Sequence, residues 1–126
     1  MVGVVVVSHS ADIARGVVDL AGQMAGEEVR LEGVGGDPHG TLGTDEGRVR
    51  EAIGRADQGD GVAILADLGS AVLTIHHILE SDGGGVQLAD APVVEGTVAA
   101  AVVASMGLPL DAVIKAAEEA RDARKR

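Results

Sequence analysis

Short apolar runs alternate with amphipathic stretches along the chain. The first run, Val4 to Val7, is four β-branched residues that stiffen χ1 and leave no polar face, as in a strand buried on both sides of a parallel sheet. The run from Val62 to Ala66 has the same character. Glu28 to Val34 alternates apolar and polar residues, which predicts an edge strand, and Val86 to Leu88 predicts a short fourth strand.

Between the first three strands, apolar residues recur every three or four positions, which predicts amphipathic helices. The first helix is expected over Ala11 to Gly26, with Ser10 as its N-cap. The second begins after an N-cap at Thr44 and closes at Gly59-Asp60-Gly61. The residues expected to face the core are Ile13, Val17, Leu20, Ala21 and Met24 in the first helix and Val49, Ala52, Ile53 and Ala56 in the second.

Three further helices follow the third strand. One is expected from Ser70 to Asp82, one after Pro92 and one after Pro109. The residues expected to face the core are Val72, Ile75 and Leu79, then Val94, Val98, Ala101 and Val102, and finally Leu110, Val113, Ile114 and Ala117.

Strands that alternate with helices imply parallel strands joined by right-handed crossovers. We therefore predict an α/β fold: a doubly wound, mainly parallel four-stranded sheet with helices on both faces. The simplest strand order is 2-1-3-4. Because the chain has 126 residues, 1–126 is expected to form one domain. Ligands of such sheets bind at the carboxyl ends of the strands, where the strand order reverses.

Two polar residues follow the two central strands of this predicted sheet. His9 ends the first strand and Asp67 ends the third. Neighbouring strands lie about 4.8 Å apart, so these side chains are expected within hydrogen-bonding distance. A carboxylate that accepts the Nδ1 proton leaves the Nε2 lone pair free to attack and stabilises the imidazolium that forms. We predict that His9 is a nucleophile for a phosphoryl group and that Asp67 orients it.

The phosphate would be bound without Lys or Arg, since neither is expected around the site. Helix N-termini bind anions through their free amides, which here are those at Ser10-Ala11 and Gly69-Ser70. The hydroxyls of Ser8, Ser10 and Ser70 are expected to donate as well. The glycine-rich loop 35–43 is long enough to reach the site, so His39 and Thr44 are candidate loop contacts.

Composition excludes several classes of function. The net charge of −10 and the absence of Phe, Tyr and Trp argue against nucleic-acid binding. The absence of Cys excludes thiolate chemistry, and the lack of a long apolar run predicts a cytoplasmic protein without a membrane partner. No metal or other cofactor is predicted. The alternatives are a magnesium cluster of Asp37, Asp45 and Asp67 and a metal pair at His76-His77, which with Glu80 is better interpreted as a solvated helix face.

Four blocks of the sequence resemble the mannose-type enzyme IIA family of the phosphotransferase system. They are Val-Val-Ser-His-Ser near the amino terminus, Gly43-Thr44-Asp45, Asp67-Leu68-Gly69-Ser70-Ala71 and Ala91-Pro92-Val93-Val94-Glu95-Gly96-Thr97. They occur in order and at matching distances. Within the family they are most similar to the phosphoryl carriers of phosphoenolpyruvate-dependent dihydroxyacetone kinases. In this resemblance, the phosphorylated histidine falls on His9 and its orienting aspartate on Asp67, while Gly69 and Ser70 match a phosphate-facing turn.

The resemblance also implies an activity and partners. Such carriers act as phosphotransferase subunits that accept phosphate from HPr and deliver it to ADP held on the DhaL subunit, and DhaK binds the dihydroxyacetone. They are typically homodimers and hold no nucleotide themselves. Two alternatives stay open at this point. One is the IIA component of a mannose-family sugar transporter, and the other is a doubly wound interaction or sensing module whose histidine transfers nothing.

Overall fold

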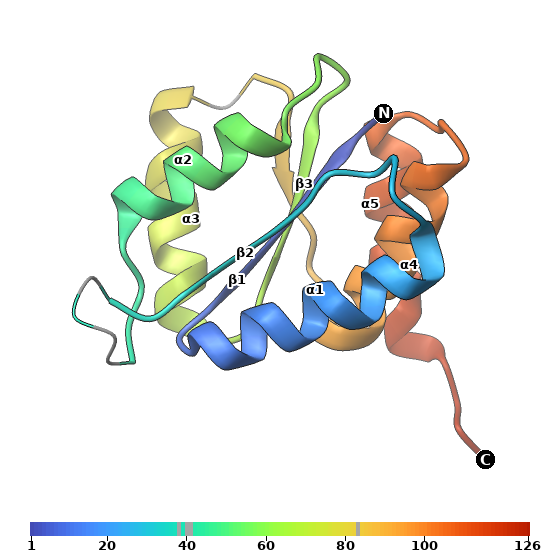
Figure 1. The fold of residues 1–126 in the computed structure, drawn as a ribbon, viewed down its shortest axis with the longest axis horizontal. Coiled ribbons are helices and arrows are strands. Elements are labelled where there is room, and N and C mark those ends of the chain that lie inside the picture. Colours follow the sequence, from blue (N-terminus) through green and yellow to red (C-terminus); the bar gives the residue numbers. More distant parts are fainter. Residues whose placement is uncertain (38, 40–41, 83) are drawn as a thin grey trace.

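The fold is a four-stranded, wholly parallel sheet with the strand order β2-β1-β3-β4. The computed structural model describes residues 1–37, 39, 42–82 and 84–126. Figure 1 shows the strands crossing the centre of the molecule between two groups of helices. The elements are β1 (Gly3–Ser8), α1 (Ala11–Ala25), β2 (Leu31–Gly35), α2 (Glu46–Ala56), β3 (Val62–Ala66), α3 (Gly69–Asp82), β4 (Val86–Leu88), α4 (Val93–Ser105), α5 (Leu110–Glu119) and a closing 3₁₀ turn η1 (Ala120–Asp122). The predicted fold class and strand order are confirmed.

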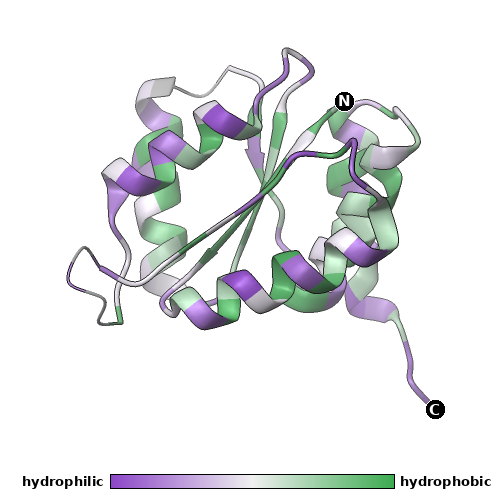
Figure 2. Cartoon of the chain, viewed as in Figure 1, coloured by the Kyte–Doolittle hydropathy of each residue, from purple (hydrophilic) through white to green (hydrophobic). Residues whose placement is uncertain are grey.

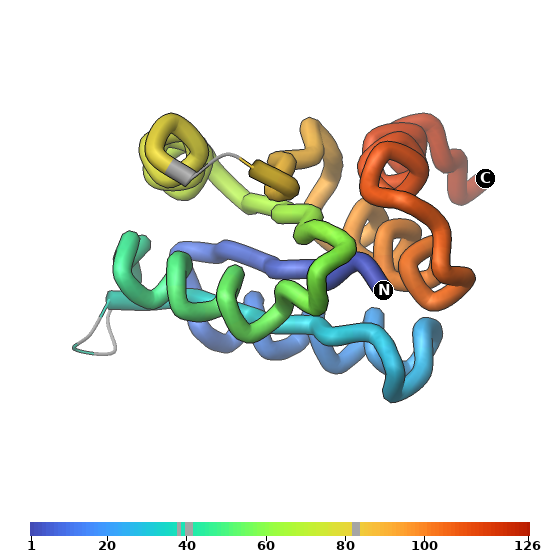
Figure 3. Tube along the Cα trace, turned by 90° about the horizontal axis from the view of Figure 1, so that it is seen from above, coloured from blue at the N-terminus to red at the C-terminus, as the bar shows by residue number. Residues whose placement is uncertain are grey.

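Alternate residues of the central strands supply two separate cores. Val5, Val7 and Ile64 pack under α2 and α3, whereas Val4 and Leu65 pack under α4 and α5. This alternation follows from the two-residue period of a strand, which points successive side chains to opposite faces. The view from above shows α1 and α2 toward the β2 edge of the sheet and α3 and α5 toward the β4 edge (Figure 3). The central strands are among the most hydrophobic parts of the molecule, and the carboxy-terminal tail is hydrophilic (Figure 2).

The buried residues differ from the predicted core-facing residues in helices that pack against other helices. In α1 the buried residues are Ala14, Val17 and Ala21, while Ile13, Leu20 and Met24 are 49%, 44% and 62% exposed. In α4, Gly96, Thr97, Ala100, Ala101 and Ala104 are buried, whereas Val94 is exposed and Val98 and Val102 are half-buried. Small residues permit the close approach of α1, α4 and α5 on one face of the sheet, so the larger residues turn outward. The predicted core positions of Ile13, Leu20, Met24 and Val94 were therefore wrong.

Element ends also needed correction. β2 begins at Leu31 rather than Glu28, because its pairing with β1 starts at Val4 opposite Leu31. The N-cap of α2 is Asp45 and not Thr44, since the Asp45 carboxylate accepts the hydrogen bond from the Arg48 N–H. The last residue of α2 is Ala56, ahead of the predicted stop at 59–61. In α3, Ala71, Ile75 and Ile78 are buried, whereas the predicted Val72 and Leu79 are half-buried, with Leu79 packed against that core.

Candidate functional site

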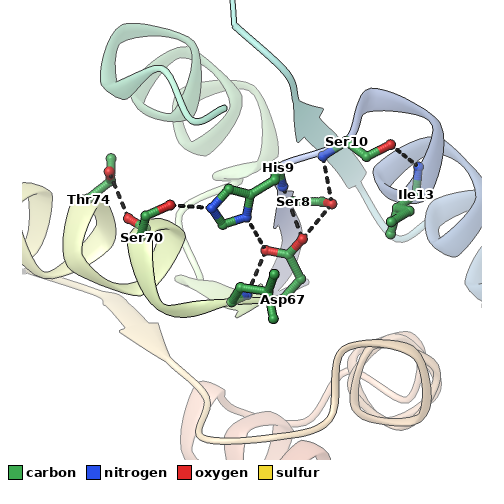
Figure 4. Close-up of polar contacts among 8 residues, drawn as sticks. Ser8, His9, Ser10, Ile13, Asp67, Ser70 and Thr74 are labelled. Atoms are coloured by element: carbon green, nitrogen blue, oxygen red, sulfur yellow. Dashed lines mark hydrogen bonds and ion pairs between the residues drawn. The ribbon is translucent and has the colours of Figure 1, made fainter. Parts of the chain in front are cut away.

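The carboxyl ends of β1 and β3 lie side by side and bring His9 against Asp67. Val7 pairs with Ala66, so the residues after the two strands leave the sheet at the same edge. His9 Nδ1 lies 3.0 Å from Asp67 Oδ1 (Figure 4). The side chains are 24% and 11% exposed, respectively, so the pair lies at the surface without being freely solvated. The predicted contact between these residues is present.

The Asp67 carboxylate receives four hydrogen bonds. Oδ2 accepts from the Ser8 hydroxyl at 2.8 Å and from the His9 backbone N–H at 3.0 Å, and Oδ1 accepts from His9 Nδ1 at 3.0 Å and from the Leu68 N–H at 2.7 Å. An ionised carboxylate offers about four acceptor positions. All of them are therefore occupied, and the carboxylate has one orientation that satisfies its donors.

The pKa of Asp67 is lowered from its ordinary value. Partial burial by itself would raise this pKa, but hydrogen bonds from the His9 N–H, the Ser8 hydroxyl, the His9 ring and the Leu68 N–H outweigh it. Asp67 is therefore ionised at neutral pH. An ionised carboxylate only accepts hydrogen bonds, so the proton of the shared contact belongs to His9 Nδ1. In the neutral form of the imidazole, the lone pair then lies on Nε2.

A pH-dependent contribution to stability follows from this lowered pKa. A group whose pKa is lower in the folded than in the unfolded protein stabilises the fold above the unfolded value of 3.8, and this stabilisation is lost as the pH falls through the folded value. We expect Asp67→Asn to be less stable than the wild type at neutral pH by about 1.5–3 kcal/mol, and the difference to shrink below about pH 4. Urea denaturation at both pH values measures it. A difference independent of pH would contradict the prediction.

His9 Nε2 faces the start of α3, where it contacts the Ser70 hydroxyl (Figure 4). Ser70 belongs to the first turn of that helix, and the Thr74 hydroxyl donates to its carbonyl at 3.1 Å. Amides in the first turn of a helix have no partner within the helix. Gly69 and Ser70 thus begin a helix beside the lone pair of His9.

The start of α1 borders the same site from the opposite side. Ser10 is its N-cap, as predicted, and the Ser10 hydroxyl accepts from the Ile13 N–H at 3.3 Å. Ala11 is the first helical residue and is exposed. The N-termini of two helices therefore begin next to His9, and each carries the partial positive charge that favours an anion.

Ser8 and Arg48 differ from the prediction. The Ser8 hydroxyl is fully buried and donates to Asp67, so it does not face an incoming phosphate. Arg48 donates through Nη1 to the carbonyls of Gly35 and Gly36, at 3.5 and 3.4 Å. The Gly36 N–H in turn donates to the His9 carbonyl at 3.2 Å, so Arg48 braces the loop beside the site. Neither role had a signal in the sequence, because both depend on which strand end lies against which loop.

Of the two loop candidates, neither side chain is shown to contact His9. His39 is exposed, and its backbone N–H donates to Asp37 Oδ1 at 2.9 Å. Thr44 Oγ1 is buried without a hydrogen-bond partner, one position before the N-cap of α2. The loop itself does approach the site, since the Gly43 N–H donates to the His9 carbonyl at 3.0 Å. Residues 38, 40 and 41 of the predicted loop lie outside the described residues.

The remaining polar residues form no metal centre in the described part of the chain. No group of three or more metal-ligating side chains converges there. His77 is exposed and its Nδ1 contacts the Glu46 carboxylate on α2. His76 is also exposed and lines a cleft of about 610 Å³ that opens beside Asp67. Within the described ranges, no helix has the length and apolarity that crossing a bilayer requires.

Comparisons with known proteins give a consistent picture. A family model described as PTS system fructose IIA component matches residues 3–114. The phosphoryl donor subunit DhaM of the PEP-dependent dihydroxyacetone kinase from Escherichia coli is 39% identical over 99% of the chain, and the corresponding protein of Klebsiella michiganensis is 38% identical over the same share. The chain spans 28% of the length of both. A DhaM subunit of Listeria innocua is 38% identical, with 82% of each chain covered.

Solved structures share the fold. The crystal structure of the unknown-function protein EF1359 superposes with a TM-score of 0.81 at 34% identity, and 94% of each chain is covered. A sigma-54 interaction domain protein from Enterococcus faecalis has a TM-score of 0.73 at 16% identity, with 96% of this chain and 90% of that chain covered. The second likeness concerns the fold alone.

Proposed function

The chain belongs to the mannose-type enzyme IIA family, in its DhaM branch, and from this membership we propose that His9 carries a phosphoryl group on Nε2. The observation that carries the proposal is the hydrogen bond of His9 Nδ1 to Asp67. It holds the Nδ1 proton in place, so the lone pair of the ring lies on Nε2, at the exposed side of the site.

The transfer needs two substitutions at phosphorus. The Nε2 lone pair of His9 forms a bond to phosphorus while the bond from phosphorus to the donor breaks and its electron pair leaves with the donor. The ring becomes an imidazolium that Asp67 stabilises, because it faces the Nδ1 proton. In the second step an oxygen of the acceptor attacks phosphorus, and the electron pair of the Nε2–P bond returns to His9. The proton on Nδ1 stays in place throughout.

The phosphoryl oxygens are held by the two helix starts in this proposal. The amide of Ala11 lies on one side and those of Gly69 and Ser70 on the other, and the Ser70 hydroxyl donates to the same group. The predicted contribution of the Ser10 amide is not part of this proposal, because the Ser10 N–H donates to the Ser8 hydroxyl at 3.0 Å. Phosphoryl transfer depends mainly on positioning and electrostatic stabilisation, which these backbone dipoles supply.

We propose that residues 1–126 form one phosphocarrier domain that accepts phosphate from phospho-HPr and delivers it to ADP bound on DhaL, in a pathway completed by DhaK. The support is the name of the relatives, phosphoryl donor subunits of dihydroxyacetone kinases. This subunit would bind no cofactor itself. Two exposed apolar residues lie near the site: Leu42 in the loop 35–43 and Leu68 directly after Asp67. They would form part of the surface on which these partners dock.

The proposal is tested by incubation of the chain with phosphoenolpyruvate, enzyme I and HPr. The expected result is a mass gain of one phosphate that is labile in acid and stable in base, as a phosphohistidine is. The phosphorylated protein is then mixed with ADP-loaded DhaL or with a mannose-family IIB protein. Loss of phosphate to DhaL supports the proposed branch, and loss to IIB alone supports the transporter reading. Absence of any phosphate uptake would leave the interaction or sensing module.

We also propose that the chain is a homodimer that pairs through α1. Leu20 and Met24 lie 7 and 11 positions after Ile13, so the three residues share one side of a helix with 3.6 residues per turn, and all three are exposed. Leu20→Glu should convert a dimer into a monomer, because a buried unpaired charge in an interface is costly. Light scattering coupled to size exclusion measures the mass. Arg15→Glu, an exposed change on the opposite side of the same helix, should leave the dimer intact, and a monomeric wild type would refute the pairing.

A further inference from the structure

Ser8 is a polar residue in a fully buried position. Along the described ranges, the polar side chains with no solvent exposure are Ser8 at the end of β1 and Thr97 in α4. A hydroxyl removed from water is costly unless it is hydrogen-bonded. The Thr97 hydroxyl donates to the carbonyl of Val93, within its own helix. Ser8 instead bonds to two groups of the site.

The two bonds of Ser8 fix the direction of its hydroxyl. The Ser10 N–H donates to Ser8 Oγ at 3.0 Å, and Ser8 Oγ lies 2.8 Å from Asp67 Oδ2. An amide N–H only donates and an ionised carboxylate only accepts. The hydroxyl proton of Ser8 therefore points at Asp67. The hydroxyl thus joins the N-cap residue of α1 to the carboxylate that contacts His9.

From this geometry we propose that Ser8 is a positioning residue, which fixes the Asp67 carboxylate so that Oδ1 stays aligned with His9 Nδ1. The inference extends the proposed function, on which its effect on phosphoryl transfer rests. Its effect on the His9 ring does not depend on that function.

Ser8 differs in kind from the other donors to the carboxylate. Two of them are the backbone N–H groups of His9 and Leu68, and the third is the His9 ring itself. A backbone N–H group is present whichever side chain the residue carries, so these two donors do not depend on residue type. Without the Ser8 hydroxyl, one acceptor position of Oδ2 is empty, and the Ser10 N–H loses its acceptor as well. The carboxylate can then rotate, and Oδ1 no longer has a fixed orientation toward the ring.

The ring nitrogens of His9 report on this positioning directly. In the wild type, ¹⁵N NMR should show the proton on Nδ1 and the lone pair on Nε2. In Ser8→Ala we expect a measurable fraction of the opposite tautomer and a rate of His9 phosphorylation that is about ten- to a hundredfold lower, as for the loss of a hydrogen bond to a charged group. Ser8→Thr restores the hydroxyl on a β-branched side chain that suits a strand, so it should keep the wild-type tautomer.

Thr97→Val is the matched control, since it removes the other fully buried hydroxyl and keeps the side-chain shape. It should change stability alone, with the tautomer and the rate as in the wild type. A wild-type tautomer in folded Ser8→Ala would overturn the inference, and so would an equal shift in Ser8→Thr. If the wild type takes up no phosphate while Ser8→Ala still shifts the tautomer, the proposed function fails and the positioning role of Ser8 stands.

Discussion

Replacement of His9 by alanine should abolish phosphate incorporation. The wild-type chain is expected to take up one phosphate in the presence of phosphoenolpyruvate, enzyme I and HPr, and His9→Ala none above background. The reason is that His9 Nδ1 is hydrogen-bonded to Asp67, so Nε2 is the ring nitrogen whose lone pair can attack phosphorus. Intact-protein mass spectrometry measures the gain in mass. Samples treated with acid or with base before the measurement show whether the phosphate is acid-labile and base-stable.

The control for this experiment is His77→Ala. His77 is exposed on α3 and contacts Glu46 rather than the site, so its removal should leave incorporation at one phosphate. Both variants lose one imidazole, which makes the comparison specific for position. Phosphate uptake by His9→Ala would refute His9 as the carrier.

Replacement of Asp67 by alanine should slow the phosphorylation of His9 by about 10²-fold or more, because misplacement of a reacting group by about 1 Å has an effect of this size. The variant loses the acceptor for the Nδ1 proton and the negative charge that stabilises the imidazolium. It also leaves the Ser8 hydroxyl and two backbone N–H groups without their acceptor, so a loss of about 1–3 kcal/mol in the free energy of unfolding is expected as well. Rapid-quench kinetics with phospho-HPr measure the rate.

Asp19→Ala removes the same charge from an exposed position in the middle of α1 and serves as the matched control. Its rate should equal that of the wild type, which separates the loss of orientation from the change in net charge. Circular dichroism and thermal unfolding establish that Asp67→Ala is folded under the conditions of the assay. A folded Asp67→Ala protein with the wild-type rate would exclude the orienting role.

The sheet and the meeting of His9 with Asp67 were within reach of the sequence. Val4 to Val7 and Val62 to Ala66 have no polar face, which places both strands in the middle of a parallel sheet. The simplest topology makes these two strands neighbours in the sheet. The contact between His9 and Asp67, which follow the two strands, results from that pairing. The strand bounds of β3 and β4 also agree with the predicted ranges.

The sequence did not allow a correct prediction of the start of α2 or of the residues that face outward in α1 and α4. Thr44 and Asp45 are both good N-cap residues, and the path of the preceding loop decides which of them has the extended backbone of a cap. In α1, Leu20 and Ala21 are adjacent apolar residues. Which of the two faces the core depends on how closely α4 approaches, and the pattern of α1 alone carries no information on that distance.

Side-chain roles around the carboxylate were the least predictable part of the site. Ser8 continues a buried strand, so its hydroxyl faces inward by the alternation of side chains, but its partner lies 59 positions away. Arg48 is a surface residue of an amphipathic helix in sequence, and its contact with the carbonyls after β2 arises from the fold. Both contacts depend on which way a side chain turns at a strand end or a loop, and neither the apolar pattern nor the simplest topology determines that direction.

The saturated carboxylate of Asp67 has a consequence for the direction of phosphate flow. Because its partners all come from the same chain, the imidazole has its reactive geometry before a partner protein arrives and keeps it after one departs. Under the proposed function, an arriving and a leaving phosphoryl group meet the same ring, the same amides and the same hydroxyl. The same preformed site then serves both transfers. The phosphoryl-transfer free energies of donor and acceptor, together with their concentrations, set the net direction.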